Sequence, residues 1–278
     1  MTNPIADPLV ENLDTDAVSS LVRIEATEEG AVTITINSPA TKNAFDAQVI
    51  AALAQAFETM HGAEGVRIVF LQGEGGVFSA GANLEWMAAA AELSEADNRE
   101  DAMAMAGMLK ALWDIPALTV ALVEGGAFGG GAGLAAACDL AIAVDGAKFS
   151  FSEVRLGLIA ATISPYVVRA IGPRQARALF ATGRVFDAGY AEKIGLVSEV
   201  VAAGEVAAAK ARLTREIMAC APGAVADSKR LVDDVFGRRI DPGLMDDTAR
   251  RIAARRIGDE GQEGVRAFIE RRKPSWNG

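Results

Sequence analysis

The feature that most limits how this chain can fold is an apolar run that leads into three consecutive glycines. Residues 117–123 read Ala-Leu-Thr-Val-Ala-Leu-Val, and Gly129, Gly130 and Gly131 follow in a stretch of small residues that reaches Asp139. The pattern predicts a strand that passes through a turn into a helix, and glycines there let the backbone approach a bound group without a Cβ in the way. The first amides of such a helix lack partners and suit an anion, or an oxygen that becomes anionic in a reaction. A tight turn without a ligand is the alternative, and it would be favoured if the turn stood alone.

Other segments extend this alternation of strands and helices. Residues 21–25 and 32–36 alternate apolar and polar side chains across a Glu-Glu-Gly turn, which predicts a hairpin. The runs 66–71 and 140–144 are apolar on both faces, as in sheets that helices cover. Together these runs predict an α/β domain of repeated crossover units, and from Thr162 onward the sequence is nearly all helical in pattern.

Composition excludes several classes of function. The chain has 278 residues, of which 51% are hydrophobic and 23% charged, and its net charge is −10 without a basic block. We therefore expect no nucleic-acid partner. Cys138 and Cys220 are expected to be buried free thiols, and neither a leader nor an apolar run of membrane-spanning length is present, so we expect a cytoplasmic protein without a membrane partner. The single histidine, His61, has no fitting cluster of ligands, so we expect no metal site.

Three regions follow from the pattern. Residues 1–20 are polar and without period, which indicates an N-terminal arm. Residues 21–200 hold the strands and glycine turns of the core, and residues 201–278 form a helical C-terminal region with alternating charges and apolar stripes. We interpret that last region as a solvated helical bundle without chemistry of its own. Contact between the subunits of an oligomer is the first further role that we expect for it.

A second glycine turn and one carboxylate complete a candidate site. The turn from Gly73 to Asn83 also leaves a buried strand, and two such turns can bring two backbone N–H donors to one point, as in an oxyanion hole. Glu153 lies in the apolar run 149–157, where burial would raise its pKa toward the range of a general acid or base. The alternative is a carboxylate on the face of a short strand over 147–153, paired with Arg155 two residues on. Spacing alone leaves the two readings equal.

At these residues the chain resembles the enoyl-CoA hydratase/isomerase (crotonase) superfamily. The likeness rests on Phe78-Ser-Ala-Gly-Ala-Asn-Leu84, Gly129-Gly-Gly-Ala-Gly-Leu134 with Cys138-Asp139, and Phe149-Ser-Phe-Ser-Glu153. Further landmarks are Asn37-Ser-Pro through Asn43-Ala44, Asp187-Ala188 through Gly195-Leu-Val, and Phe268 through Lys273-Pro274. The resemblance implies a crotonase-like spiral of repeated ββα units over 21–200 and a C-terminal trimerisation region over 201–278. It also implies a homo-oligomer, a trimer or dimer of trimers, with coenzyme A bound only as part of an acyl-CoA substrate.

Carried over by position, the resemblance assigns roles to individual residues. The backbone N–H groups of Ala82 and Gly130 would hold the thioester oxygen, and Glu153 would be one of two catalytic glutamates. Lys42 would contact phosphate, as would Lys273 from a neighbouring subunit. The CoA-binding residues implied in this way are Lys42, Ala44, Ala80, Ala82, Asn83, Leu84, Glu85, Gly130 and Lys273.

Two departures from the family pattern bear on the substrate. Gly133 stands where family hydratases usually carry the second glutamate, and residues 158–165 replace the usual run rich in proline and glycine. Both features resemble the bacterial branch that acts on methylglutaconyl-CoA and isohexenylglutaconyl-CoA, in leucine and acyclic terpene breakdown. We expect the space beside the triple-glycine turn to hold part of a branched substrate or a water.

The leading hypothesis is a hydratase that adds water to a 2-enoyl-CoA, in fatty-acid or leucine catabolism, on a substrate with a 3-methyl branch. One alternative is a double-bond isomerase, which needs an enolate hole and one carboxylate but no second group to position water; Gly133 keeps it open. Another is a non-catalytic CoA-binding or RNA-associated scaffold. The absence of a basic stripe weighs against RNA, and the presence of Glu153 with both glycine turns weighs against a site without activity.

Overall fold

The computed structural model describes residues 20–277, which divide into two compact units. The first unit contains residues 20–115 and 119–210, and the second contains residues 116–118 and 211–277. The predicted arm over residues 1–20 falls outside the described residues except for Ser20.

The first unit is built on a six-stranded sheet with strand order β1-β2-β3-β4-β6-β9. Its strands are β1 (Val22–Ala26), β2 (Ala31–Ile36), β3 (Ile68–Gly73), β4 (Leu118–Val123), β6 (Leu140–Val144) and β9 (Glu199–Val201). The first two form the predicted antiparallel hairpin, in which Val22 lies opposite Ile36. The pairs β2–β3, β4–β6 and β6–β9 are parallel. Strands β3, β4 and β6 are apolar on both faces because helices cover the sheet.

A second, three-stranded sheet explains the repeats in the sequence. It consists of β5 (Gly126–Phe128), β7 (Lys148–Ser150) and β8 (Phe186–Asp187). The chain passes from β4 to β5 and into helix α5 (Gly130–Ala137), and then from β6 to β7 and on to helix α6 (Ser164–Thr182). Each pass adds one strand to each sheet before a helix returns, so the predicted ββα repeat is confirmed.

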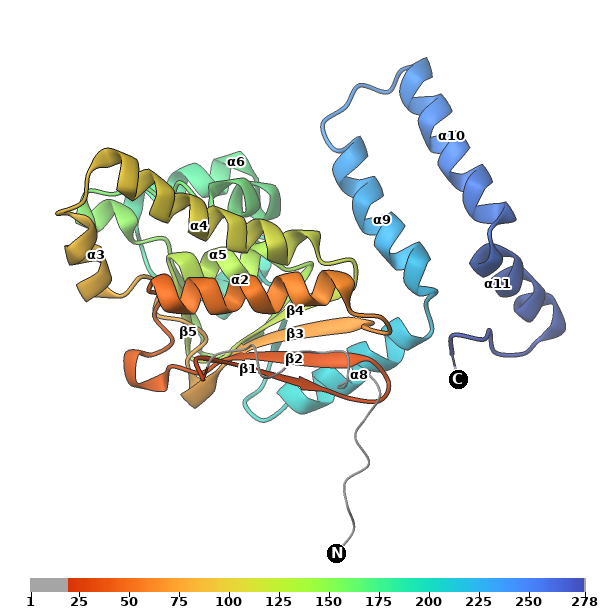
Figure 1. The fold of residues 1–278 in the computed structure, drawn as a ribbon, viewed down its shortest axis with the longest axis horizontal. Helices are drawn as coiled ribbons and strands as arrows, with labels where there is room; N and C mark the ends of the chain where they lie inside the picture. Colours follow the sequence, from red (N-terminus) through yellow and green to blue (C-terminus); the bar gives the residue numbers. More distant parts are fainter. Residues whose placement is uncertain (1–19, 278) are drawn as a thin grey trace, which may run out of the picture. The chain divides into compact units, whose positions relative to one another are not determined.

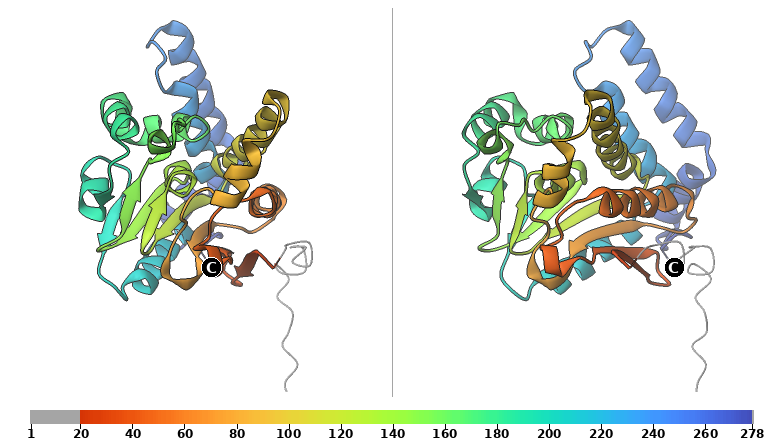
Figure 2. Two further views of the ribbon diagram at one scale, coloured as in Figure 1. Left: turned by 90° about the vertical axis from the view of Figure 1, so that its left-hand side faces the viewer. Right: turned by 60° about the vertical axis from the view of Figure 1, so that its left-hand side comes forward.

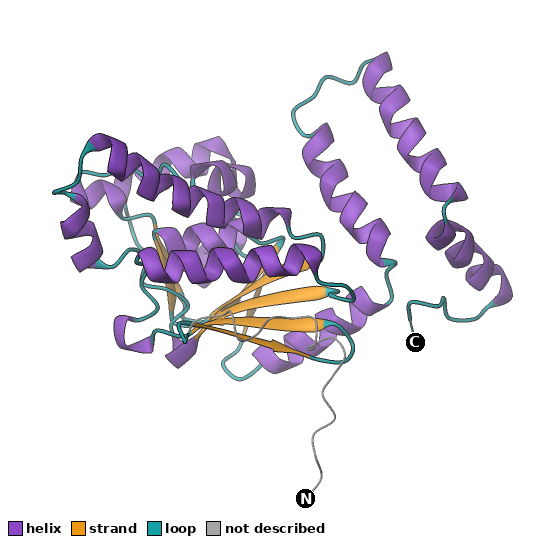
Figure 3. Cartoon of the chain, in the orientation of Figure 1, coloured by secondary structure: helices purple, strands orange, loops and turns teal. Residues whose placement is uncertain are grey.

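Helices α2 (Ala47–Gly62), α3 (Leu84–Ala90), α4 (Glu95–Asp114) and α7 (Ala188–Lys193) complete this unit. Asp46 caps α2, because its carboxylate accepts the N–H groups of Gln48 at 3.0 Å and Val49 at 2.9 Å. Helices α2 and α4 pack against each other over the strands (Figures 1 and 3). The views of Figure 2 show α3 leading into α4.

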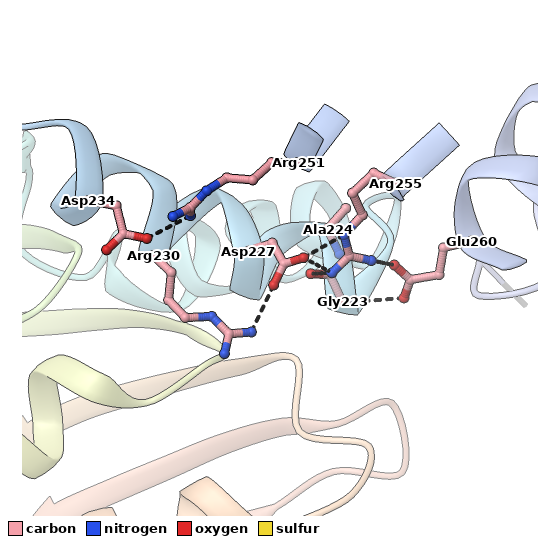
Figure 4. A network of polar contacts seen from close by, with 8 residues as sticks. All are labelled: Gly223, Ala224, Asp227, Arg230, Asp234, Arg251, Arg255 and Glu260. Atoms are coloured by element: carbon pink, nitrogen blue, oxygen red, sulfur yellow. Dashed lines mark hydrogen bonds and ion pairs between the residues drawn. The ribbon is translucent and has the colours of Figure 1, made fainter. Parts of the chain in front are cut away.

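Helix α8 (Val206–Met218) crosses the boundary between the units, and α9 (Pro222–Val235), α10 (Pro242–Ile257) and α11 (Asp259–Glu270) form the second unit. Figure 4 shows the polar network that joins these three helices. Arg255 contacts Asp227 at 2.6 Å and Glu260 at 3.0 Å. Glu260 in turn accepts the N–H groups of Gly223 and Ala224, which begin α9 and lack intrahelical partners.

Several sequence-based expectations need correction. The strand predicted over 147–153 ends at Ser150, and Glu153 begins a short 3-10 helix, η4 (Glu153–Leu156), closed by Gly157 in the left-handed conformation. Cys138 is buried as expected, whereas Cys220 is exposed.

Two expected absences concern the described residues alone. Among residues 20–277, none of the helices combines the length and apolar character needed to cross a membrane. Within the same residues, no group of three or more histidine, cysteine, aspartate or glutamate side chains is placed to hold a metal ion.

Candidate active site

The two glycine turns meet at the ends of neighbouring strands. Ser79 and Ala127 form a parallel bridge between the turns, and the Phe128 amide donates to the Ser79 carbonyl at 3.0 Å. Gly81 has a φ of 86°, and a Cβ there would lie 2.7 Å from the Phe128 carbonyl oxygen. Glycine at 81 therefore allows the first turn to lie directly against the second.

The first turn is also fixed by a loop that precedes α2. The Phe45 amide donates to the Gly81 carbonyl at 2.7 Å, and the Asn83 amide donates to the Phe45 carbonyl at 2.7 Å. These two bonds bracket Ala82 without using its N–H group. In the part of the chain that the structure describes, the Ala82 amide has no acceptor.

The second donor is the amide of Gly130, the first residue of α5. Gly129 before it has φ 49° and ψ −118°, a conformation that a side chain would strain. The N–H group of Gly130 begins the helix and has no acceptor among residues 20–277. Both predicted oxyanion-hole donors are therefore available to a ligand.

Asn43 and Ser79 lock the loops that carry these donors. The Asn43 side chain is fully buried; its amide nitrogen donates to the carbonyls of Glu74 at 2.9 Å and Val77 at 2.7 Å, and its oxygen accepts the Ser38 amide. The Ser79 hydroxyl donates to the Asn43 carbonyl and accepts the Gly81 amide. The position of Ala82 is thus set by buried polar side chains that sequence reasoning did not assign.

Ala82 and Gly130 line one cavity together with Glu153. Its volume is about 440 Å³, and most of its wall is apolar. The other lining residues are Phe45, Trp86, Met87, Ala90, Ala91, Asn98, Asp101, Ala102, Met105, Leu158, Ile159, Ala160, Thr162 and Ile163. No lysine or arginine is among the lining residues that the structure describes.

Glu153 has the features expected of a proton-transfer group. Its Oε2 atom is buried and has no hydrogen-bond partner among the described residues. Burial raises the pKa of the Glu153 carboxyl, an effect that a hydrogen bond from its own backbone amide partly opposes. The alternative pairing with Arg155 is not observed, since the two residues are in η4 rather than on one strand face. A Cβ at Gly129 would lie 3.1 Å from Glu153 Oε1, so the carboxylate lies against the triple-glycine turn.

The space directly beside Gly133 is filled, while Gly130 of the same turn lines the cavity, so a substrate branch or a water beside the triple-glycine turn stays a prediction. A Cβ at Gly133 would overlap Ile163 Cγ2 and would lie 2.7 Å from Ile163 Cβ. Ile163 is 2% exposed and also lines the cavity. An apolar side chain from the segment before α6 therefore takes the space next to Gly133.

The remaining predicted CoA-binding residues fall into three groups. Lys42 and Ala44 lie in the loop before α2, and the Lys42 carbonyl accepts the Ala80 amide at 2.9 Å, so this loop and the first turn run side by side. Asn83 caps α3 by accepting the amides of Glu85 and Trp86. The side chains of Leu84 and Glu85 are exposed and do not line the cavity. Lys273 is exposed in the second unit.

Asp101 is the lining residue that sequence reasoning missed. It is a half-buried carboxylate on α4, and burial raises its pKa. A signal existed, because Asp101 lies one helical turn before the buried Met105 and therefore shares the apolar face of the helix.

Comparisons with known proteins agree with this geometry. The family model for enoyl-CoA hydratase/isomerase matches residues 26–278. An enoyl-CoA hydratase of Shewanella pealeana is 34% identical and superposes with a TM-score of 0.91, over 98% of this chain and all of that one. AtuE of Pseudomonas aeruginosa is 36% identical with a TM-score of 0.88, over 93% of this chain and all of that one. The enoyl-CoA hydratase ACTT6 of Alternaria alternata is 32% identical over 244 residues, which are 87% of this chain and 79% of that protein.

The repeated ββα units, the two glycine turns and these matches agree with one another, and the chain belongs to the enoyl-CoA hydratase/isomerase family as an enzyme with the crotonase fold.

Proposed function

We propose that this enzyme adds water across the double bond of a 2-enoyl-CoA thioester. The observation that carries the proposal is the cavity in which two unpaired backbone amides, of Ala82 and Gly130, meet the unpaired buried carboxyl oxygen of Glu153. Relatives named as enoyl-CoA hydratases support the reaction type.

Each part of the site has a role in that reaction. The two amides donate to the thioester oxygen, which becomes negative as the C2=C3 electron pair shifts toward the carbonyl, and such donors are worth several kcal/mol of barrier. Glu153 exchanges a proton with the substrate, because its raised pKa lets the carboxyl hold a proton near neutral pH more readily than an exposed glutamate. The apolar wall of the cavity excludes water and strengthens both interactions.

Coenzyme A is proposed to bind only as part of the substrate, with its phosphates near Lys42 and near Lys273 of a neighbouring subunit in a trimer or dimer of trimers. Both lysines are assigned from their positions in the family motifs. The side-by-side course of the loops at Lys42 and Ala80 adds structural support for Lys42. The expected cytoplasmic location stays a prediction.

A substrate with a 3-methyl branch, of the methylglutaconyl type, is proposed from the sequence of residues 158–165 and from Gly133. A glutaconyl group ends in a carboxylate, for which the described lining of the cavity offers no cation. A second cavity of about 440 Å³ shares Glu153, Leu158, Ile159 and Ala160 with the first, and Arg177 lines it. We assign the terminal carboxylate to Arg177, which would place the enzyme in the breakdown of branched, leucine-type thioesters.

The hydratase proposal is tested by mixing the purified enzyme with crotonyl-CoA and 3-methylglutaconyl-CoA in H₂¹⁸O and analysing the products by mass spectrometry. We expect one ¹⁸O atom in the 3-hydroxyacyl product, and faster turnover of the branched thioester. Glu153→Gln should still bind both thioesters but turn over about 10²–10⁴-fold more slowly, the usual contribution of a positioned acid or base.

Isomerisation is the second candidate, favoured by the absence of a side chain at Gly133 and the apolar Ile163 beside it. Incubation with a 3-enoyl-CoA separates the two reactions. A shifted double bond without ¹⁸O in the product would identify an isomerase and overturn the hydratase proposal.

A further inference from the structure

A second carboxylate lines the cavity, and it comes from helix α4 instead of the segment that carries Glu153. Asp101, on α4, lines the cavity and is half-buried. Its carboxylate has no hydrogen bond or ion pair with any residue in the range 20–277. Partial burial raises the pKa of the Asp101 carboxyl.

The neighbours of Asp101 on α4 show which way this face of the helix points. Met105 lies four residues on, hence on the same face, and its Cε atom would be 2.9 Å from a Cβ at Gly130. The face that carries Asp101 is therefore turned toward the proposed oxyanion hole. Asn98, one turn earlier, also lines the cavity, but its side-chain amide donates to the carbonyls of Ala90, at the end of α3, and of Leu93 and Ser94, which follow that helix.

Asp101 and Glu153 are the carboxylates among the lining residues that the structure describes. Helix α5 supplies none, because Gly133 has no side chain and Ile163 fills the space beside it. Addition of water takes one proton from the water and delivers one proton to C2, and two carboxyls in the cavity can divide these two transfers. Glu153 lies against Gly129, the residue before the Gly130 amide that would hold the thioester oxygen, and C2 is one bond from that carbonyl carbon.

We propose that Asp101 is the second catalytic carboxylate of this enzyme and activates the water that adds to C3. This inference rests on the proposed hydratase function. As the water oxygen bonds to C3, the Asp101 carboxylate takes one proton of that water, and the C2=C3 electron pair moves to form the enolate held by Ala82 and Gly130. C2 of the enolate then takes the proton of the Glu153 carboxyl. The proton on Asp101 passes to solvent and Glu153 takes one up, so that both carboxyls return to their starting states and no electrons are gained or lost.

The experiment separates water activation from enolate formation. Hydration of crotonyl-CoA and 3-methylglutaconyl-CoA is measured beside deuterium exchange from D₂O into C2 of butyryl-CoA, which needs the oxyanion hole and Glu153 but no added water. Asp101→Asn should lower hydration at least 100-fold and change C2 exchange by less than threefold. Asp101→Glu should restore part of the hydration rate, and Glu153→Gln should lose both activities. Glu100→Gln, an exposed carboxylate next to Asp101 on α4, is the matched control and should match the wild type.

Three outcomes contradict the inference. If Asp101→Asn hydrates within threefold of the wild type, the role of Asp101 is wrong while the hydratase proposal stands. If the variant loses hydration and C2 exchange equally, Asp101 acts on the enolate or on the fold and not on water. If the wild type exchanges the C2 proton but hydrates neither thioester, the proposed function fails and takes the role of Asp101 with it.

Discussion

The side chain of Ile163 fills the space into which a side chain at Gly133 would project. The two residues come from different repeats, since Gly133 is in α5 and Ile163 immediately precedes α6. The apolar environment at this point therefore depends on both residues: Gly133 leaves the space and Ile163 fills it. A glutamate cannot be introduced on α5 without moving the isoleucine.

Replacing Gly133 by glutamate should lower stability and activity together. The new side chain would overlap Ile163, and overpacking of this kind costs about 1–3 kcal/mol before the cost of a buried charge is added. Thermal unfolding and crotonyl-CoA hydration measure the two effects. The double variant Gly133→Glu with Ile163→Gly removes the overlap, so its loss in free energy of unfolding should be smaller than the sum of the losses of the two single variants. A single Gly133→Glu variant that became a fast crotonyl-CoA hydratase would contradict the proposed packing and the branched-substrate assignment.

The Glu153 carboxyl should lower the free energy of unfolding at neutral pH, although catalysis depends on it. Burial holds the pKa of its carboxyl in the folded protein above its ordinary value of 4.5, so the ionised form is disfavoured in the folded state. Below pH 4.5 the carboxyl is neutral in both states and causes no loss. As the pH rises through the folded-state pKa, stability is lost in the wild type but not in Glu153→Gln.

Urea unfolding of both proteins between pH 4 and pH 8 measures this difference. The free energy of unfolding of Glu153→Gln relative to the wild type should increase with pH. A constant or decreasing difference would show that the carboxyl is not desolvated in the folded enzyme.

Arg177 should distinguish thioesters that end in a carboxylate from those that do not. It lines the second cavity, which shares Glu153 with the first. Arg177→Gln should raise KM for 3-methylglutaconyl-CoA roughly tenfold, in line with a charge-assisted hydrogen bond of about 1.5–3 kcal/mol, and should leave KM for crotonyl-CoA unchanged. Arg174→Gln, an exposed position on the same helix, is the control. Equal changes for both thioesters in Arg177→Gln would remove the carboxylate assignment.

Replacing Asn43 should lower stability and activity more than replacing most other polar residues. Its buried side chain makes hydrogen bonds to Glu74, Val77 and Ser38, and its φ of 56° suits asparagine better than alanine. Asn43→Ala leaves buried partners unpaired, at about 1–3 kcal/mol each, and should lower the midpoint of thermal unfolding and kcat together. Asn37→Ala, at a half-buried asparagine nearby, should change both far less. Wild-type kcat in Asn43→Ala would mean that the loop does not fix Ala82.

The enzyme should be an oligomer in solution. The exposed fractions of Ile257, Phe268 and Ile269 in and around α10 and α11 are 80%, 86% and 73%, more apolar surface than a monomer usually exposes in one region. Light scattering at micromolar concentration should give the mass of a trimer or hexamer. Phe268→Glu should lower that mass, and Phe268→Leu should not. A wild-type mass of 28.9 kDa, that of a single chain, would contradict the prediction.

The alternation of apolar runs and glycine turns was enough to predict the α/β class and the hairpin of β1 and β2. The resemblance to the crotonase superfamily then assigned Ala82, Gly130 and Glu153, which the structure brings to one cavity, because glycine turns leave a local signal in the sequence. Long-range packing leaves none. Ile163 is 30 positions from Gly133, and nothing local indicates that it fills the space there.

The error at Glu153 has a similar origin. The pattern over 147–153 predicted a strand, yet the chain leaves the sheet after Ser150 and forms η4 from Glu153. Asp101 was overlooked because a single carboxylate on an amphipathic helix reads as a solvated side chain until the wall opposite it is known.

The two proposed donors of the site are backbone amides, and this has a consequence for how the enzyme tolerates mutation. Any point substitution other than one to proline exchanges the side chain but leaves the N–H group of Ala82 in the chain. The hole is then lost only through a change of backbone geometry and not by deletion of a functional group. The side chains that hold this geometry, such as Asn43 and Ser79, are buried away from the substrate. Side chains of the cavity wall can therefore be substituted, which changes the acyl groups that fit, while the two backbone amides that stabilise the enolate keep their positions.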